Sequence, residues 1–123
     1  MAPYRTLKAW QHAERLAVEC VRAAKQFPAY EQGALADQLR RAAYSVPLNI
    51  AEGSARRASR EYRKFLDTAN SSIAEVETAL ALAYKFEYLS TTDYERISAI
   101  ATEAGKTLFG LLRKLTDVTT RRT

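Results

Sequence analysis

The 123-residue sequence is poor in the residue types that build turns, disulfides and membrane spans. It has four glycines and three prolines, so a few long helices are favoured over many short strands. Its one cysteine, Cys20, cannot form an intramolecular disulfide, and we expect it in an apolar core. No apolar run approaches the roughly 20 residues that cross a bilayer, and the N-terminus lacks the apolar region of a signal peptide. We therefore expect a cytoplasmic protein.

Residue sets typical of catalytic and metal sites are also missing. The only histidine is His12, and Ala9 stands where a Glu-x-x-His motif of a dinuclear bundle site would need its glutamate. One histidine with Cys20 cannot complete a zinc site. Glu75 and Glu77 are two residues apart on an expected helix, point to different sides and make a poor acid–base pair. Without a Gly-rich phosphate loop either, we expect no enzyme activity, no metal and no cofactor.

The residues that are present favour one folded domain over residues 1–123. Hydrophobic residues make up 47% of the chain and charged residues 27%, which is the balance of a globular protein. Helical periodicity predicts four helices, over about residues 6–26, 34–57, 59–88 and 92–115. The polar tail, residues 116–123, is expected to fray.

Each predicted helix carries apolar residues three or four positions apart, which line one of its faces. In chain order these stripes are Leu7, Trp10, Ala13, Ala17, Cys20, Ala24 and Phe27; Leu35, Leu39, Ala42, Val46, Ile50 and Gly53; Tyr62, Leu66, Ala69, Ile73, Val76, Leu80 and Ala83; and Tyr94, Ile97, Ala101, Ala104, Leu108, Leu111 and Leu115. Each stripe can be buried only against another, and short connections make sequential neighbours antiparallel. The fold predicted is all-α, an antiparallel up-down four-helix bundle.

Local signals predict where these helices begin, end and bend. Phe27-Pro28 ends the first, because the residue before a proline is pushed out of helical geometry. Pro47 lies inside the second and predicts a kink or a division into two shorter helices. Ser59 is expected to cap the third helix, and Thr92 and Glu95 are expected to form a capping box at the start of the fourth.

Basic residues gather in the middle of the chain, which has a net charge of +5. If residues 56–64 are helical, five of them fall within an arc of about 120° that faces solvent; they are Arg56, Arg57, Arg60, Arg63 and Lys64. A solvated helix face explains this pattern. A patch that binds anions explains it too, because a cation at the N-terminus of the third helix costs on the order of 0.3–1 kcal/mol and hints at another use.

The middle of the chain resembles the signature of the "four helix bundle protein" family. The resemblance is carried by Gln38-Leu39-Arg40-Arg41-Ala42-Ala43, Ser45-Val46 and Asn49-Ile50-Ala51-Glu52-Gly53, with flanking matches at Leu7-x-x-Trp10, Ser59-x-x-Tyr62 and Glu75-Val76-Glu77. Members of this family include proteins encoded within intervening sequences of bacterial large-subunit ribosomal RNA genes. The accessory variability proteins of diversity-generating retroelements are related to it. The sequence departs from the family pattern at Ala34 and Asn70.

This resemblance implies a homo-oligomer, typically a ring-like pentamer. The retroelement relatives use a positively charged pentamer to bind nucleic acid and a reverse transcriptase. Carried over to this sequence, that role implies the nucleic-acid-binding residues Arg40, Arg41, Arg56, Arg57, Arg60, Arg63 and Lys64. Asn49, Glu52 and Gly53 are either structural or make contacts at an interface. The sequence thus predicts a non-enzymatic, homo-oligomeric scaffold for RNA or DNA, with a protein–protein adaptor without nucleic-acid binding as the alternative.

Overall fold

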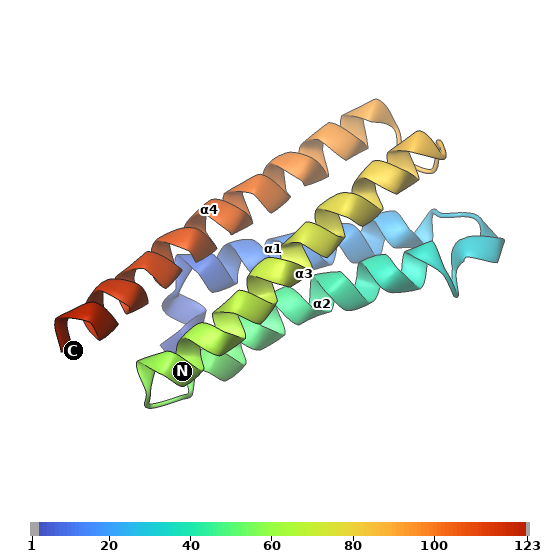
Figure 1. The fold of residues 1–123 in the computed structure, drawn as a ribbon. Helices are drawn as coiled ribbons and strands as arrows, with labels where there is room; N and C mark the ends of the chain where they lie inside the picture. The colour runs from blue at the N-terminus through green and yellow to red at the C-terminus, as the bar shows by residue number, and fades with distance from the viewer. Residues whose placement is uncertain (1–2, 123) are drawn as a thin grey trace.

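The computed structural model describes the backbone of residues 3–122 and the side chains of residues 4–115, and every regular element in that part of the chain is helical. Figure 1 shows the four long helices, which are α1 (Lys8–Lys25), α2 (Leu35–Ser54), α3 (Ser59–Lys85) and α4 (Thr91–Arg122). Two short 3₁₀ turns, η1 (Pro3–Thr6) and η2 (Ala29–Glu31), precede α1 and α2. The predicted all-α class is confirmed.

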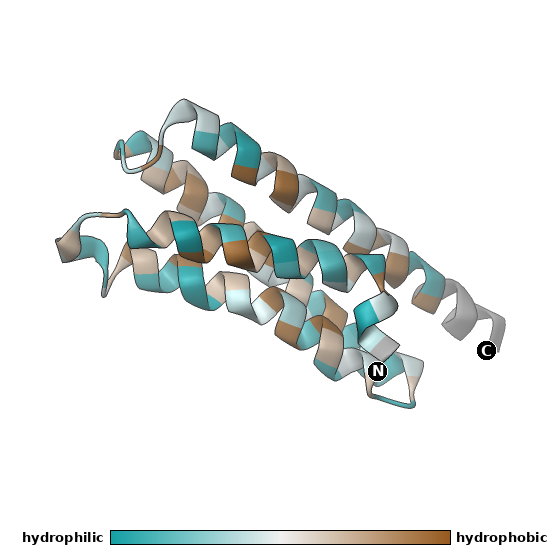
Figure 2. Ribbon diagram, turned by 180° about the vertical axis from the view of Figure 1, so that it is seen from behind, coloured by the Kyte–Doolittle hydropathy of each residue, from teal (hydrophilic) through white to brown (hydrophobic). Residues whose placement is uncertain are grey.

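Each helix packs against two others. Consecutive helices are in contact, and α1 also packs against α4, so the four helices enclose one core. In Figure 1, η1, the α2–α3 connection and the end of α4 lie at one end of the bundle, while η2 and the α3–α4 connection lie at the other. Hydrophobic and hydrophilic residues alternate along each helix (Figure 2). None of the helices in the described part of the chain is long and apolar enough to cross a membrane.

The buried core follows most of the predicted stripes. Leu39, Val46 and Ile50 on α2 and Leu66, Val76 and Leu80 on α3 are fully buried or nearly so, as their spacing predicts. Three large residues outside the stripes are buried as well: Leu16 on α1, Ile100 on α4 and Leu89 in the α3–α4 connection. Because α1 and α4 each pack against two neighbours, each buries a face wider than a single row of residues.

Two predicted helix caps are wrong. Ser59 is the first residue of α3 and Ala58 precedes it, with no side-chain hydrogen bond capping the helix. At α4 the Ser90 hydroxyl accepts a hydrogen bond from the Asp93 backbone N–H at 3.1 Å, so the cap lies two residues before Thr92. The α1 boundary is as predicted, because the helix ends at Lys25, before Phe27-Pro28.

Pro47 lies within α2, which continues as one helix from Leu35 to Ser54. The predicted division into two shorter helices is therefore wrong, and the kink stays a prediction. At the other end of the chain, the α4 backbone is helical to Arg122. The side chains of the predicted frayed tail, residues 116–123, lie outside the described residues, so that prediction also stands untested.

Candidate nucleic-acid interface

The seven basic residues proposed from the sequence lie in two separate places. Arg40 and Arg41 belong to the first half of α2, whereas the other five surround the connection between α2 and α3. Arg41 is 13 residues before the end of α2 at Ser54, which is roughly 20 Å along the helix axis, and Arg56 lies beyond that end. The structure therefore does not bring the seven into one patch.

Arg40 has a clear structural role. Its guanidinium donates to the backbone carbonyl of Gln32 at 2.7 Å and to the Gln32 side chain at 3.1 Å. The Gln32 side chain in turn donates to the carbonyls of Ala24 and Phe27, at 2.9 and 3.0 Å, where α1 ends. With its side chain only 23% exposed, Arg40 fastens the α1–α2 connection and presents little charge to a ligand. Its exposed neighbour Arg41 pairs with Asp37 at 3.8 Å.

Arg56 is also engaged within the chain. Its guanidinium lies 3.0 Å from a carboxylate oxygen of Glu52 and 4.8 Å from the centre of the Phe65 ring, so it links the end of α2 to α3. The predicted single helical arc for residues 56–64 is wrong, because α2 ends at Ser54 and residues 55–58 form a connection. Arg56 and Arg57 therefore lie before α3 and not along its side.

The remaining four cations of this cluster have no such partners. Of the ion pairs between described side chains, none includes Arg57, Arg60, Arg63 or Lys64. Arg63 is half-buried and the other three are exposed. They surround the first turns of α3, whose N-terminus carries the positive end of the helix dipole. Their charges add to that of the helix terminus and exceed the one negative charge of Glu61 in the first turn, so the start of α3 favours an anion.

Further basic residues reach the same end of the bundle from distant parts of the sequence. Lys8 at the start of α1 and Lys114 near the end of α4 line one hollow. In Figure 1 these segments lie at the same end as the α2–α3 connection. We call this surface the basic end, and it consists of Arg5, Lys8, Arg56, Arg57, Arg60, Arg63, Lys64, Arg113 and Lys114. The sequence alone did not place Arg5, Lys8, Arg113 and Lys114 on this surface, because they lie far from the arginine run in the sequence and reach it only through the packing of α1 and α4.

The opposite end of the bundle is aromatic and acidic. The Tyr88 hydroxyl donates to Glu31 at 2.8 Å and lies 3.1 Å from the Tyr30 hydroxyl. The hydrogen bond with Tyr30, followed by burial and the hydrogen bond with Glu31, raises the pKa of Tyr88. Glu87 and Glu95 add exposed carboxylates here. Cations are thus more numerous at the basic end, whereas at the opposite end the cations that finish α1 and α3, Lys25 and Lys85, are accompanied by these carboxylates.

Asn49, from the motif shared with the family, takes part in hydrogen bonds that join α2 to α3. Its side-chain amide donates to the Ser45 carbonyl at 2.8 Å and to the Ser45 hydroxyl at 2.9 Å. The Ser72 hydroxyl of α3 donates to the same Ser45 oxygen at 2.7 Å. Ser72 is itself buried, so these bonds satisfy polar groups within the helix interface.

Of the glycines in the described chain, Gly53 is the one whose position brings α2 into close contact with α3. A Cβ atom at this position would be 2.8 Å from Phe65 Cβ and 3.2 Å from the Tyr62 carbonyl oxygen. Real Cβ atoms do not come so close to atoms fixed to the backbone, so the contact requires glycine. Together with Asn49 and the Glu52–Arg56 pair, the motif residues all have partners inside the chain.

Groups that could support catalysis are isolated from one another. No cluster of three or more His, Cys, Asp or Glu side chains in the described part of the chain could hold a metal ion. His12 is half-buried in a hollow between α1 and α4, beside Arg15 and Arg96. Cys20 is fully buried, and this burial, with a smaller effect of Glu19, raises the pKa of its thiol to about 12. At neutral pH it is protonated and a poor nucleophile.

Comparisons with known proteins agree with this fold. A crystal structure of a protein of unknown function from the S23 ribosomal protein family of Bacteroides thetaiotaomicron superimposes with a TM-score of 0.77 and 26% sequence identity. The match covers 85% of this chain and 97% of that one. No curated protein matches the sequence. The family profile described as 23S rRNA-intervening sequence protein matches residues 5–110, and the chain belongs to this family.

Proposed function

We propose that this protein is a non-enzymatic, homo-oligomeric scaffold that binds RNA or DNA through its basic end. The observation that carries the proposal is the group of cations around the start of α3, of which Arg57, Arg60 and Lys64 are exposed and outside any ion pair between described side chains. Phosphate groups bind such a surface through charge-assisted hydrogen bonds and through the release of counterions. A reverse transcriptase or another nucleic-acid-processing protein is the proposed partner.

The proposed assembly strengthens this binding. One copy offers a single basic end, which supports salt-sensitive binding to a phosphate backbone. In a ring such as a pentamer the basic end is repeated around the axis, and contacts to one nucleic acid then add through effective concentration. Within each copy we propose the up-down antiparallel order, because connections as short as residues 55–58 favour antiparallel neighbours, and a kink of α2 at Pro47.

The alternative is an adaptor that binds only other proteins. Large exposed apolar side chains favour it, among them Leu48 on α2 and Phe109 on α4. Salt dependence separates the two functions, since phosphate contacts release counterions and apolar protein contacts do not. Under the adaptor alternative, nucleic acid does not bind even at about 50 mM salt, where surface charges are screened least.

The test is titration of the protein into labelled structured RNA and labelled duplex DNA, with fluorescence anisotropy recorded over a series of salt concentrations. We expect micromolar or tighter binding that weakens steeply with salt. The triple variant Arg57→Gln, Arg60→Gln, Lys64→Gln is expected to bind at least about tenfold more weakly and to have a shallower salt dependence.

A matched control replaces Arg15, Lys85 and Lys106 with glutamine. These three cations lie outside the basic end, and either triple variant lowers the net charge from +5 to +2. The control is expected to keep most of the wild-type affinity. If the two triple variants lose affinity equally, binding follows overall charge and the assignment to the basic end is wrong.

A further inference from the structure

Two apolar surfaces on different sides of α2 have no function in the proposal above. The first, which we call the ridge, runs along α1 and α2 and consists of Val18, Tyr44 and Leu48. These side chains are 43%, 45% and 66% exposed, which is unusual for large apolar residues at neighbouring positions on packed helices. Tyr44 and Leu48 are one helical turn apart and project from the same face of α2.

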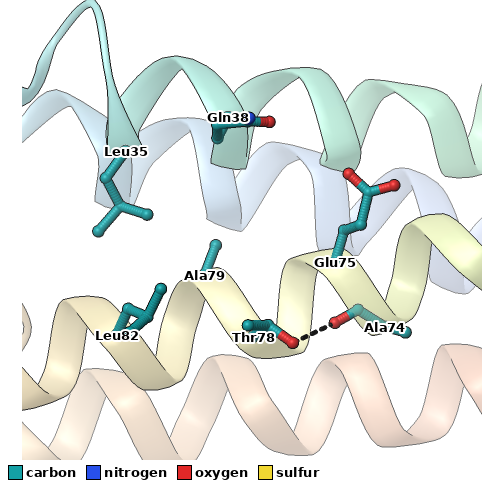
Figure 3. A pocket seen from close by; sticks show the side chains of 7 residues that line it. All are labelled: Leu35, Gln38, Ala74, Glu75, Thr78, Ala79 and Leu82. Atoms are coloured by element: carbon teal, nitrogen blue, oxygen red, sulfur yellow. Dashed lines mark hydrogen bonds between the residues drawn. The ribbon is translucent and has the colours of Figure 1, made fainter.

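The second surface is a groove between α2 and α3, which Figure 3 shows from close by. Leu35 on α2 and Ala79 on α3 point toward one another across it, and Leu82 and Ala74 continue its wall along α3. Its volume is about 400 Å³. A cavity of roughly 150 Å³ already holds a benzene ring. The groove therefore has room for an aromatic or branched side chain.

The charges beside the two surfaces are opposite. Arg22 and Lys25 line the hollow next to Val18 and Tyr44, whereas Glu75 is the charged residue in the groove. Neither Lys25 nor Glu75 takes part in an ion pair between described side chains, and Arg22 has only a 3.6 Å contact with Glu19. The cations beside Val18 and Tyr44 and the carboxylate in the groove are thus opposite in charge, which favours contact between this part of the ridge and the groove.

We infer that the ridge of one copy of this chain docks into the α2–α3 groove of a second copy. The inference rests on the homo-oligomeric part of the proposed function and names the surfaces that carry it. Tyr44 and Leu48 fill the groove between Leu35 and Leu82, and Lys25 faces Glu75. Because the two surfaces differ, a pair of docked copies keeps one unused ridge and one unused groove, and the contact repeats until a ring closes.

Complementation between two variants tests this contact, with molar mass measured by light scattering after size exclusion. Leu48→Asp removes the ridge and keeps the groove, and Leu82→Asp removes the groove and keeps the ridge. Both residues are substantially exposed, so both variants are expected to fold, which circular dichroism checks. We expect each variant alone to be monomeric, and an equimolar mixture to form a dimer through the one intact ridge and the one intact groove.

A second pair of variants tests the charges. Lys25→Glu and Glu75→Lys are each expected to weaken self-association on the order of tenfold, and the double variant is expected to recover most of it. Phe109→Asp is the control, since Phe109 is 61% exposed and belongs to α4, which lines neither the groove nor the hollow beside the ridge. Its mass is expected to equal that of the wild type.

The outcomes separate this inference from the function on which it rests. An oligomeric wild type whose mass is unchanged by Leu48→Asp and Leu82→Asp overturns the ridge–groove contact and leaves the proposed scaffold intact. Loss of assembly in Phe109→Asp alone places the contact on the α3–α4 face and overturns it as well. A monomeric wild type overturns both the contact and the proposed assembly, while anisotropy still decides whether the basic end binds nucleic acid.

Discussion

Replacement of Gly53 by alanine is expected to destabilise the bundle, although alanine forms helices better than glycine does. The added Cβ would be 2.8 Å from Phe65 Cβ and 3.0 Å from an atom of the Tyr62 ring. Because Phe65 Cβ is fixed to the α3 backbone, the helices must separate, and overpacking of this kind costs about 1–3 kcal/mol. The gain in helix propensity is at most about 1 kcal/mol, and smaller here since α2 ends at Ser54. We expect a net loss of about 1 kcal/mol.

The same substitution elsewhere in the chain provides the control. Gly105 and Gly110 lie inside α4, and a Cβ at either position would meet no atom within 4 Å. Gly105→Ala and Gly110→Ala are therefore expected to stabilise the protein by about 0.5–1 kcal/mol. Urea unfolding of all three variants, at one protein concentration so that assembly contributes equally, gives the comparison. A Gly53→Ala variant as stable as the Gly105→Ala variant would refute the close approach of α2 and α3.

Three further predictions follow from individual residues. Glu87 has a φ angle of 66°, a left-handed conformation that favours glycine, so Glu87→Gly is expected to raise the free energy of unfolding by about 1 kcal/mol in urea. Arg40→Ala removes the two hydrogen bonds to Gln32 and is expected to lower the free energy of unfolding by about 1–3 kcal/mol in the same assay. Its RNA affinity is expected to be unchanged, whereas Arg60→Gln is expected to weaken RNA binding. Burial raises the pKa of the Cys20 thiol from 9.0 to about 12, so above pH 9 the unfolded state loses this proton first and stability falls as the pH rises toward 12. Cys20→Ala is expected to flatten that decline, and a thiol reagent at pH 8 is expected to label the native wild type no faster than it unfolds.

The sequence predicted the helices well and their caps poorly, for different physical reasons. Burial of one face imposes its spacing on every turn, so residues such as Leu66, Ile73 and Leu80 identify α3 repeatedly. A cap is a single hydrogen bond, and three hydroxyl residues, Ser90, Thr91 and Thr92, lie side by side where α4 begins. The cap is Ser90, and the connection that leads to it leaves α3 through the left-handed Glu87, with the Tyr88 N–H bonded to the Ala83 carbonyl at 2.8 Å. The path of this connection depends on how α3 and α4 pack against each other, and a local sequence pattern does not predict that packing.

The sequence also could not predict which basic residues are available to a ligand. A run of arginines in the sequence identifies positive charge, but whether each charge is available depends on partners from other segments. Gln32 holds Arg40, and Glu52 with Phe65 holds Arg56, whereas no ion pair between described side chains includes Arg57. The fold also adds Lys114, whose place beside Lys8 follows only once α1 and α4 are packed together. The residues that an anion contacts are therefore those at the same position along the bundle axis, which need not be adjacent in the sequence. Variants that test this surface are best chosen by their position along that axis.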